Sequence, residues 1–198
     1  QRKIVLGKGG QTIKAIGAGV SRLAVGERVA VSPSRPCNTC EYCLRGLQNQ
    51  CLNMRFYGSA MPMPHIQGAF RQRLVAEEWQ CHKVGDDVSI NEAAFAEPFA
   101  VTLHAVARAG SLLGKRVLVT GCGPIGALTI IAARAHGALE IVATDLMDAV
   151  LKKAEQVGAD RTINVANAPE QLSAYAANKG YFDVHFEASG NERAIRMG

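Results

Sequence analysis

Hydrophobic and polar positions follow two different patterns along the chain. Up to about residue 90, short apolar stretches alternate with Gly, Pro and Cys, and Val29–Ser32 and Ala69–Ala76 have the character of strands separated by turns. From residue 115 on, apolar runs typical of buried strands alternate with longer helical patterns. The first pattern predicts an all-β, barrel-like unit, and the second predicts an α/β unit with a parallel sheet.

A helical stretch joins the two patterns, from Ser89 to Gly110. Ser89 and Glu92 have the spacing of a capping box, in which each side chain accepts the other residue's backbone N–H. Pro98 lies inside the stretch, and proline interrupts a helix because it lacks a backbone donor. We therefore expect two helices that meet near Glu97-Pro98.

The second half alternates strands and helices in the order that produces parallel pairing. The predicted strands are 116–120, 140–144, 161–164 and 182–187, and the predicted helices are 124–136, 149–157 and 169–178. Gly158 is a typical residue to end the middle helix. This order predicts a doubly wound parallel sheet with right-handed crossovers.

The first turn of this sheet carries a G-x-G-x-x-G motif, Gly121-Cys122-Gly123-Pro124-Ile125-Gly126, between a predicted strand and a predicted helix. In a dinucleotide-binding turn the first glycine permits the tight turn, and the second lets a pyrophosphate approach the backbone. The third allows close packing of helix on strand. The free N–H groups of the helix then favour the anionic pyrophosphate. The alternative is a glycine-rich turn in an unrelated α/β fold.

An acidic residue, Asp145, follows Gly126 by 19 positions at the end of the next predicted strand. There it is placed to accept a hydrogen bond from the ribose 2′-hydroxyl, and it would repel a 2′-phosphate. The sequence therefore predicts NAD in preference to NADP. The alternative role for Asp145 is that of a helix N-cap.

Four of the six cysteines, Cys37, Cys40, Cys43 and Cys51, are crowded into one short irregular segment. Thiols spaced C-x2-C-x2-C-x7-C can converge tetrahedrally on one Zn²⁺, and four thiolates leave no open position for a substrate. We therefore expect one structural zinc per chain. In a secreted protein the same cysteines would instead form two disulfides, but no export signal opens this sequence.

Composition narrows the remaining classes of function. The 198 residues are 48% hydrophobic and 20% charged with a net charge of +5, which is typical of a globular protein. The positive charges are scattered along the sequence, so no nucleic-acid partner is expected. The longest uncharged run, 117–133, contains three glycines and a proline, so no membrane partner is expected. The chain starts at Gln1 without Met and is expected to be a cytoplasmic fragment.

The cysteine lobe, the Glu97-Pro98 step and the glycine motif resemble, in this order, the zinc-containing medium-chain dehydrogenases of the polyol branch. The resemblance implies an α/β protein made of two partial domains. Residues 1–110 would form a GroES-like β-barrel domain, N-terminally truncated, with a zinc lobe at 36–52. Residues 111–198 would form a Rossmann domain, C-terminally truncated.

Shorter stretches are similar to the sugar-acid dehydrogenases of that branch, which interconvert L-idonate and 5-keto-gluconate. They are Asn49–Cys51, Met54–Phe56, Tyr57–Met61, Pro64-His65, Phe95–Pro98 and Lys179–Val184. The resemblance implies hydride transfer between NAD and a small polyol or sugar acid, with a second, catalytic zinc acting as Lewis acid. It further implies that Glu97 is a catalytic residue at that zinc, directly or through water. A homodimer or homotetramer is expected for the parent protein.

The sequence departs from the family at the other catalytic zinc ligands. The family's Gly-His-Glu motif is replaced here by Gly7-Lys8-Gly9, and the ligating cysteine would precede residue 1. We therefore expect the catalytic zinc in the parent only, and little or no turnover by the chain itself. Alternative functions are another polyol, alcohol or threonine dehydrogenase, and a non-catalytic, zinc-stabilised NAD-binding module.

Three histidines are weaker metal candidates. His65 lies in a proline-flanked loop where it would line a cleft. His104 is expected to pack on the helix that follows Glu97, and His185 to lie inside a strand.

Overall fold

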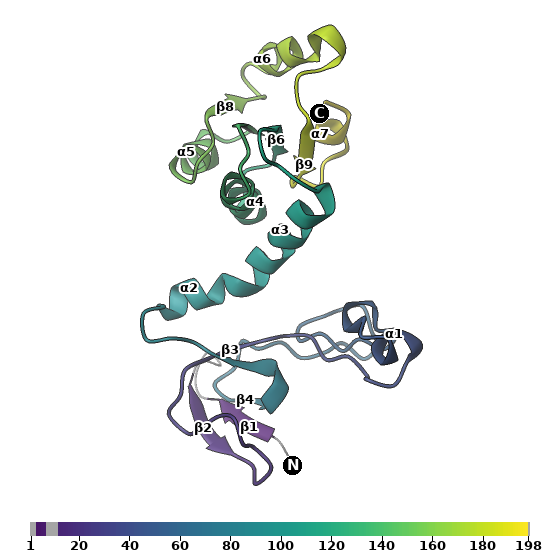
Figure 1. Ribbon diagram of the computed structural model, residues 1–198, viewed down its shortest axis with the longest axis vertical. Coiled ribbons are helices and arrows are strands. Elements are labelled where there is room, and N and C mark those ends of the chain that lie inside the picture. Colours follow the sequence, from purple (N-terminus) through teal and green to yellow (C-terminus); the bar gives the residue numbers. More distant parts are fainter. Residues whose placement is uncertain (1–2, 7–11, 198) are drawn as a thin grey trace. The chain divides into compact units, whose positions relative to one another are not determined.

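A computed structural model describes residues 3–6 and 12–197 of the chain (Figure 1). The chain divides into two compact units, Gln1–Ala96 and Glu97–Gly198. The division falls 14 residues before the predicted boundary at 110/111. The reason is helix α3 (Ala96–Ala109), whose Val106 is fully buried in the core of the second unit.

Two small antiparallel sheets form the first unit. One has the strand order β2-β1-β4, with β1 at Lys3–Leu6, β2 at Ile13–Ile16 and β4 at Leu74–Glu77. The other pairs β3 (Val29–Val31) with β5 (Cys81–Lys83). Alternate side chains of these strands are buried in one apolar core, as expected for sheets with one solvated face. The fully buried members of this core include Ile4, Leu6 and Ile13.

The predicted strand at Ala69–Ala76 is wrong in its first half. Residues 69–73 form a turn, in which the Arg71 amide donates to the Ala69 carbonyl at 2.8 Å. Phe70 has no core to enter and is fully exposed. Burial alternates only from Leu74 onward, and the strand β4 begins there.

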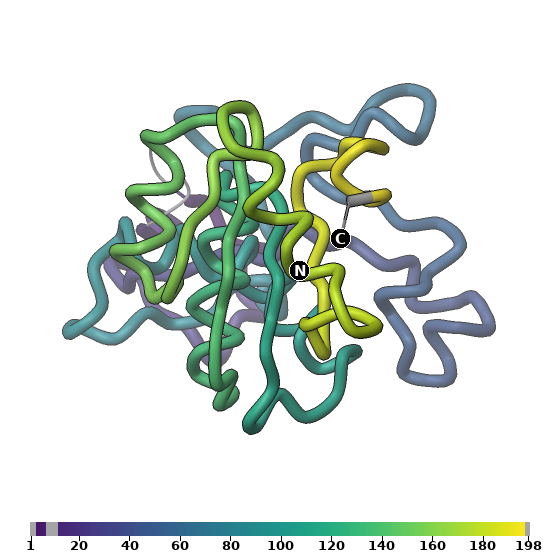
Figure 2. Tube along the Cα trace, turned by 90° about the horizontal axis from the view of Figure 1, so that it is seen from above, coloured from purple at the N-terminus to yellow at the C-terminus, as the bar shows by residue number. Residues whose placement is uncertain are grey.

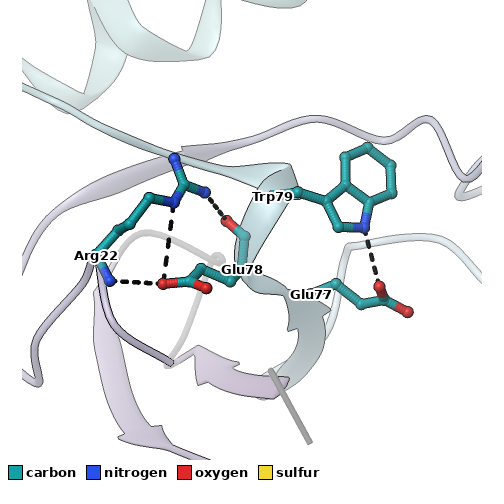
Figure 3. A pocket seen from close by; sticks show the side chains of 4 residues that line it. All are labelled: Arg22, Glu77, Glu78 and Trp79. Atoms are coloured by element: carbon teal, nitrogen blue, oxygen red, sulfur yellow. Dashed lines mark hydrogen bonds and ion pairs between the residues drawn. The ribbon is translucent and has the colours of Figure 1, made fainter. Parts of the chain in front are cut away.

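A buried polar segment joins the two sheets. The 3-10 helix η3 (Glu78–Gln80) follows β4 directly and leads into β5. The Gln80 side chain is completely buried, and its amide nitrogen donates to the carbonyls of Ser32 and Ser34 at 2.9 and 3.1 Å. Glu78 is also buried, and its carboxylate accepts the backbone N–H of Arg22 at 2.6 Å (Figure 3). These bonds satisfy backbone groups that the short strands leave unpaired.

The remainder of the first unit is a lobe of loops between β3 and β4, in blue in Figures 1 and 2. It contains the one-turn helix α1 (Glu41–Leu44) and the 3-10 helix η2 (Gln48–Gln50). The unit then ends on helix α2 (Ile90–Ala94), and Ser89 and Glu92 form the predicted capping box.

The predicted parallel sheet of the second unit is confirmed. Its strand order is β8-β7-β6-β9, and all three strand pairs are parallel. The strands are β6 (Arg116–Thr120), β7 (Glu140–Asp145), β8 (Arg161–Asn164) and β9 (Val184–Glu187). The helices are α4 (Pro124–Ala135), α5 (Asp148–Gln156), α6 (Pro169–Ser173) and α7 (Glu192–Met197), with a 3-10 helix η4 (Ala174–Lys179) after α6.

Several boundaries differ from the prediction. The helix predicted over 169–178 is α-helical only to Ser173 and continues as η4, in which Ala177 and Asn178 have non-helical backbone angles. Two further differences have identifiable reasons. The helix break falls at Phe95, because Pro98 lies in the first turn of α3, where a missing N–H costs nothing. The last strand begins at Val184 and not at residue 182. Phe182 packs instead against the ring of Tyr175, with ring centroids 4.8 Å apart, and the Asp183 carboxylate accepts the Arg116 amide at 2.9 Å.

The core of the second unit lies between the sheet and its helices. Val117, Val119 and Ile141 are fully buried on one face, and Leu118, Val142 and Ile163 form a smaller cluster on the other. Both faces are therefore covered, as parallel sheets require. Among the described residues, no helix combines the length and apolar character needed to cross a bilayer.

We predict that Gln80→Leu lowers the free energy of unfolding of the first unit by about 2–4 kcal/mol, because the Ser32 and Ser34 carbonyls and the Glu77 amide lose their partner. Denaturant unfolding followed by fluorescence of Trp79, the only tryptophan, measures this unit. Gln72→Leu, at an exposed position, is the matched control and should change stability by less than about 0.5 kcal/mol. Equal stability of the two variants would contradict the role given to Gln80.

Candidate zinc centre and dinucleotide site

The lobe brings the four predicted cysteines together. The Sγ atoms of Cys37, Cys40, Cys43 and Cys51 all lie within 4.8 Å of one another. The Cys37 and Cys51 sulfurs are 3.5 Å apart, too far for a disulfide, and all four thiols are free. Tetrahedral zinc with Zn–S bonds of about 2.3 Å needs sulfurs roughly 3.8 Å apart. The arrangement fits a closed Zn²⁺ site.

Local backbone geometry produces this convergence. Asn38 adopts a left-handed conformation with φ 59°, so the chain turns sharply between the first two cysteines. Backbone N–H groups point at sulfur: the Cys37 amide donates to Cys51 Sγ at 3.2 Å, and the Cys40 amide to Cys37 Sγ at 3.4 Å. Such donors stabilise thiolates, the form that binds metal.

The pKa values of these thiols reflect the same contacts. Hydrogen bonds from Thr39 and from the Cys40 amide lower the pKa of Cys37 to about 5, and the amides of Cys43 and Leu52 lower the pKa of Cys40. Burial raises the pKa of Cys43 to about 12. A metal cation at the centre would compensate the desolvation that disfavours the Cys43 thiolate.

The apolar residues of the lobe do not form a core. Leu44, Leu47 and Leu52 are 76, 40 and 64% exposed, and of its residues only the buried Cys43 and Ile66 belong to the apolar interior. A segment with so little apolar burial needs another source of stability. Four sulfurs of the right chemistry and spacing supply one, so the lobe fits a structural zinc.

In the second unit, the glycine motif forms the turn between β6 and α4. Gly121 has φ 85°, and an added Cβ would lie 2.6 Å from the Ser189 nitrogen. At Gly126 an added Cβ would lie 1.8 Å from the Gly121 carbonyl oxygen. A side chain is impossible at both positions without moving backbone. Gly126 therefore has the close-packing role expected of the third glycine.

Gly123 is different, because an added Cβ there would meet no atom within 4 Å. It is the residue directly before α4, whose first residue is Pro124, and no side chain caps this helix end. The backbone is thus open at the place where the motif predicts a pyrophosphate. These residues fit a dinucleotide by the space they leave and by the free amides of the helix.

Asp145 ends β7 beside this turn, at the predicted position. Its Oδ2 accepts the Cys122 amide at 2.7 Å, and its Oδ1 accepts the amides of Leu146 and Met147 at 2.7 and 3.1 Å. The carboxylate therefore ties the glycine turn to the end of the neighbouring strand. Each oxygen can accept a further hydrogen bond, so a ribose hydroxyl can still bind. Met147, and not Asp145, is the N-cap residue of α5.

A third segment, which was not predicted from the sequence, lies at this sheet edge. Glu187, the last residue of β9, accepts the amides of Ser189 and Gly190 at 2.7 and 3.2 Å through its Oε1. Hydrogen bonding by Ser189 lowers the pKa of Glu187. The signal was available, because carboxyl ends of parallel strands share one edge and ligands bind outside that edge.

The remaining candidates are spread over the chain. Glu97 lies in the first turn of α3 and its side chain is exposed. The expectation that His104 packs on its helix is wrong, because α3 buries Thr102 and Val106 while His104 is exposed. His185 is half-buried, and its Nε2 lies 3.0 Å from the Thr120 hydroxyl.

Within the described ranges 3–6 and 12–197, the four cysteines are the one group of side chains that could hold a metal ion. Lys8, which replaces the family's histidine, lies outside the described residues.

Two family models match the chain. The alcohol dehydrogenase GroES-like domain matches residues 7–86, and the zinc-binding dehydrogenase model matches residues 124–198. The chain belongs to the zinc-binding dehydrogenases. The expected α/β architecture, a GroES-like unit followed by a Rossmann-like unit, is thereby confirmed.

Individual zinc-binding dehydrogenases are similar over most of the chain. L-idonate 5-dehydrogenase (NAD(P)(+)) from Escherichia coli is 42% identical over 182 residues, 92% of this chain and 52% of the relative. Sorbitol dehydrogenase from Bacillus subtilis is 36% identical over 93% of this chain and 51% of its own length. A crystal structure of the E. coli L-idonate 5-dehydrogenase aligns with a TM-score of 0.87 at 40% identity, covering 96% of this chain and 54% of that one. The chain thus spans about half the length of these relatives.

We predict that Cys43→Ser removes the bound zinc and loosens the lobe, because three thiolates and a hydroxyl cannot close the site. Zinc per chain, measured on purified protein without added metal, should fall from about one to near zero. Cys81→Ser is the matched control, since Cys81 is equally buried but lies outside the cluster. Full retention of zinc by Cys43→Ser would contradict the assignment.

We predict opposite effects for two glycine substitutions in the fingerprint. Gly123→Ala should leave the melting temperature unchanged but weaken NAD binding by about ten-fold or more, because the methyl group enters the space left for the pyrophosphate. Gly126→Ala should destabilise the second unit itself, because its Cβ overlaps the Gly121 carbonyl. Calorimetric titration with NAD and thermal unfolding separate the two effects. A stable Gly123→Ala variant with unaltered NAD affinity would contradict a pyrophosphate site at this turn.

Proposed function

We propose that this sequence belongs to an NAD-linked oxidoreductase that transfers hydride between the cofactor and a small sugar acid or polyol, by preference L-idonate and 5-keto-gluconate. The observation that carries the proposal is the presence, on one chain, of a four-thiol lobe and an open glycine turn with an acidic residue beside it. The similarity to L-idonate 5-dehydrogenase over 92% of the chain supports the choice of substrate.

Each set of residues has a separate task in this proposal. Cys37, Cys40, Cys43 and Cys51 hold one structural zinc, which orders the lobe. Gly121, Gly123, Pro124, Ile125 and Gly126 shape the turn and the helix end that bind the pyrophosphate of NAD. Bound NAD supplies a nicotinamide ring that accepts or returns the hydride.

Asp145 determines the preference between cofactors. Its two oxygens are held by three backbone amides, so this acidic side chain is fixed in place. A 2′-phosphate would face this charge, whereas a 2′-hydroxyl would donate a hydrogen bond to it. We therefore infer a preference for NAD, although the name of the E. coli relative includes both cofactors.

Glu97 is the catalytic residue of the proposal, in the role that the family resemblance implies. Its exposure leaves the carboxylate available to a metal or a water molecule. This chain is expected to lack the second zinc, because Lys8 has a positive charge at the position where the family has a ligating histidine. The 198-residue chain should therefore bind one zinc and NAD with little turnover.

The runner-up substrates are other polyols, such as sorbitol, because sorbitol dehydrogenase is also similar over most of the chain. For the intact protein we propose a homodimer or homotetramer, as the resemblance implies. The four free thiols favour the reducing cytoplasm.

The test compares the 198-residue chain with the intact gene product that contains it. We expect the chain to hold about one zinc and to show no NAD reduction with L-idonate. The intact protein should reduce NAD with L-idonate at a kcat/KM at least about ten-fold above that with sorbitol or L-threonine. Absorbance of NADH and elemental zinc analysis are the measurements.

In the intact protein, Glu97→Gln should lower kcat/KM while NAD affinity stays unchanged, and the exposed Glu170→Gln is its control. Two zinc ions on the 198-residue chain, or turnover by it, would contradict our interpretation of Lys8. Turnover of sorbitol in preference to L-idonate would replace the substrate. NAD binding by an intact protein that turns over none of these substrates would favour the non-catalytic module.

A further inference from the structure

A pocket lies in the first unit, on the solvent face of the β2-β1-β4 sheet. It encloses about 450 Å³ between strands β1 and β4 and the loop segment 55–73. In β4, Leu74 and Ala76 point into the core, so Arg73, Val75 and Glu77 share the opposite, exposed face. Lys3 pairs with Glu77 in the register of β1 with β4 and reaches the same face. The lining includes His65, one of the weaker metal candidates, but no residue of the cysteine cluster, the glycine turn or the proposed catalytic site.

The pocket is strongly basic. Its charged lining residues are Lys3, Arg35, Arg55, Arg71, Arg73 and a single carboxylate, Glu77. Five cations against one anion leave a formal charge of +4, out of +5 for the whole chain. In the part of the chain that the structure describes, none of these five cations forms an ion pair.

Glu77 offsets only one of the five positive charges. Its Oε2 accepts the indole N–H of Trp79 at 2.9 Å, as Figure 3 shows, and its carboxylate also caps η3 by accepting the Gln80 amide. The neighbouring Glu78 carboxylate accepts the backbone amides of Ser21 and Arg22, and Arg22 does not line the pocket. The acidic groups closest in sequence are therefore engaged with partners of their own.

Backbone bonds hold the arginines in position. The Arg55 amide donates to the Arg35 carbonyl at 3.0 Å, which fixes the two residues side by side. The Arg35 guanidinium lies over the Tyr57 ring, 5.3 Å from its centroid, and the Tyr57 hydroxyl donates to the Val75 carbonyl on β4. Arg71 donates through Nε to the Gly68 carbonyl at 3.0 Å, which leaves its two terminal nitrogens free for another partner. The Arg35 and Arg71 side chains are thus held in place before any ligand arrives.

We propose that this pocket binds a small anion through a carboxylate or phosphate group. Guanidinium groups match both oxyanions with paired N–H donors, and an anion would relieve the mutual repulsion of the five cations. The volume is within the range of small-molecule sites and accommodates a six-carbon sugar acid or a sugar phosphate. The proposal does not depend on the dehydrogenase activity.

Titration calorimetry of the zinc-loaded protein tests it with three probes: D-gluconate, inorganic phosphate and the uncharged sorbitol. We expect one of the two anions to bind at one site per chain, more weakly at high salt, and sorbitol not to bind. Gluconate alone would identify a carboxylate ligand, and phosphate alone a phosphoryl ligand. Both results support the proposal.

Variants identify the site. Arg55→Gln and Arg73→Gln should each weaken anion binding by about ten-fold without changing the melting temperature, because both side chains are exposed. Arg108→Gln, an exposed arginine on α3, is the matched control and should leave the affinity unchanged. The proposal is overturned by equal binding of sorbitol, by anion binding that both pocket variants retain, or by binding of an oligonucleotide but neither small anion.

Discussion

The second unit depends on how closely the chain passes itself at the carboxyl edge of its sheet. Gly126 lies so near the Gly121 carbonyl that even one methyl group cannot fit, and Gly121 has no room for a side chain beside the backbone of Ser189. These approaches bring β6, the start of α4 and the segment after β9 together. Asp145 adds β7 through its bond to the Cys122 amide. At Gly123, by contrast, an added Cβ would meet no atom within 4 Å, so the turn is open there.

The first unit solves the problem of stability differently. Its two sheets share a small apolar core, but the lobe between β3 and β4 contributes almost nothing to that core. Polar contacts replace apolar burial there: Gln80 holds the start of the lobe through the Ser32 and Ser34 carbonyls, and four thiols gather at its tip. A lobe built in this way gains most of its order when a metal binds, since binding and folding are coupled. The two units therefore differ in what their stability depends on.

The sequence predicts the second unit better than the first, because the two units differ in how their strands are buried. The strand 116–120 was predicted to the residue, because Val117, Leu118 and Val119 form a continuous run buried on both faces. The strand at 69–76 was half wrong, because in a sheet with one solvated face an apolar residue such as Phe70 can lie entirely outside. The spacing of the glycine motif and of the four cysteines was enough to predict the role of Gly126 and the cluster of thiols. The position of Glu187 at the same edge follows from the order of the parallel strands, in which β9 lies beside β6, and not from the spacing of a motif.

The distribution of positive charge shows most clearly what the sequence alone does not predict. By sequence the positive residues are scattered, since Lys3, Arg35, Arg55, Arg71 and Arg73 are spread over some 70 positions. Antiparallel pairing of β1 with β4 and the backbone hydrogen bond between Arg55 and Arg35 bring them together around one pocket. Net charge affects solubility and association, but the fold determines whether the charges are spread over the surface or concentrated at one place. In this protein the glycine turn would hold an anion with neutral backbone amides, whereas the basic pocket would hold one with formal charges. The salt dependence of binding should therefore be steep at the pocket and shallow at the turn, because screening acts on exposed charges far more than on close hydrogen bonds.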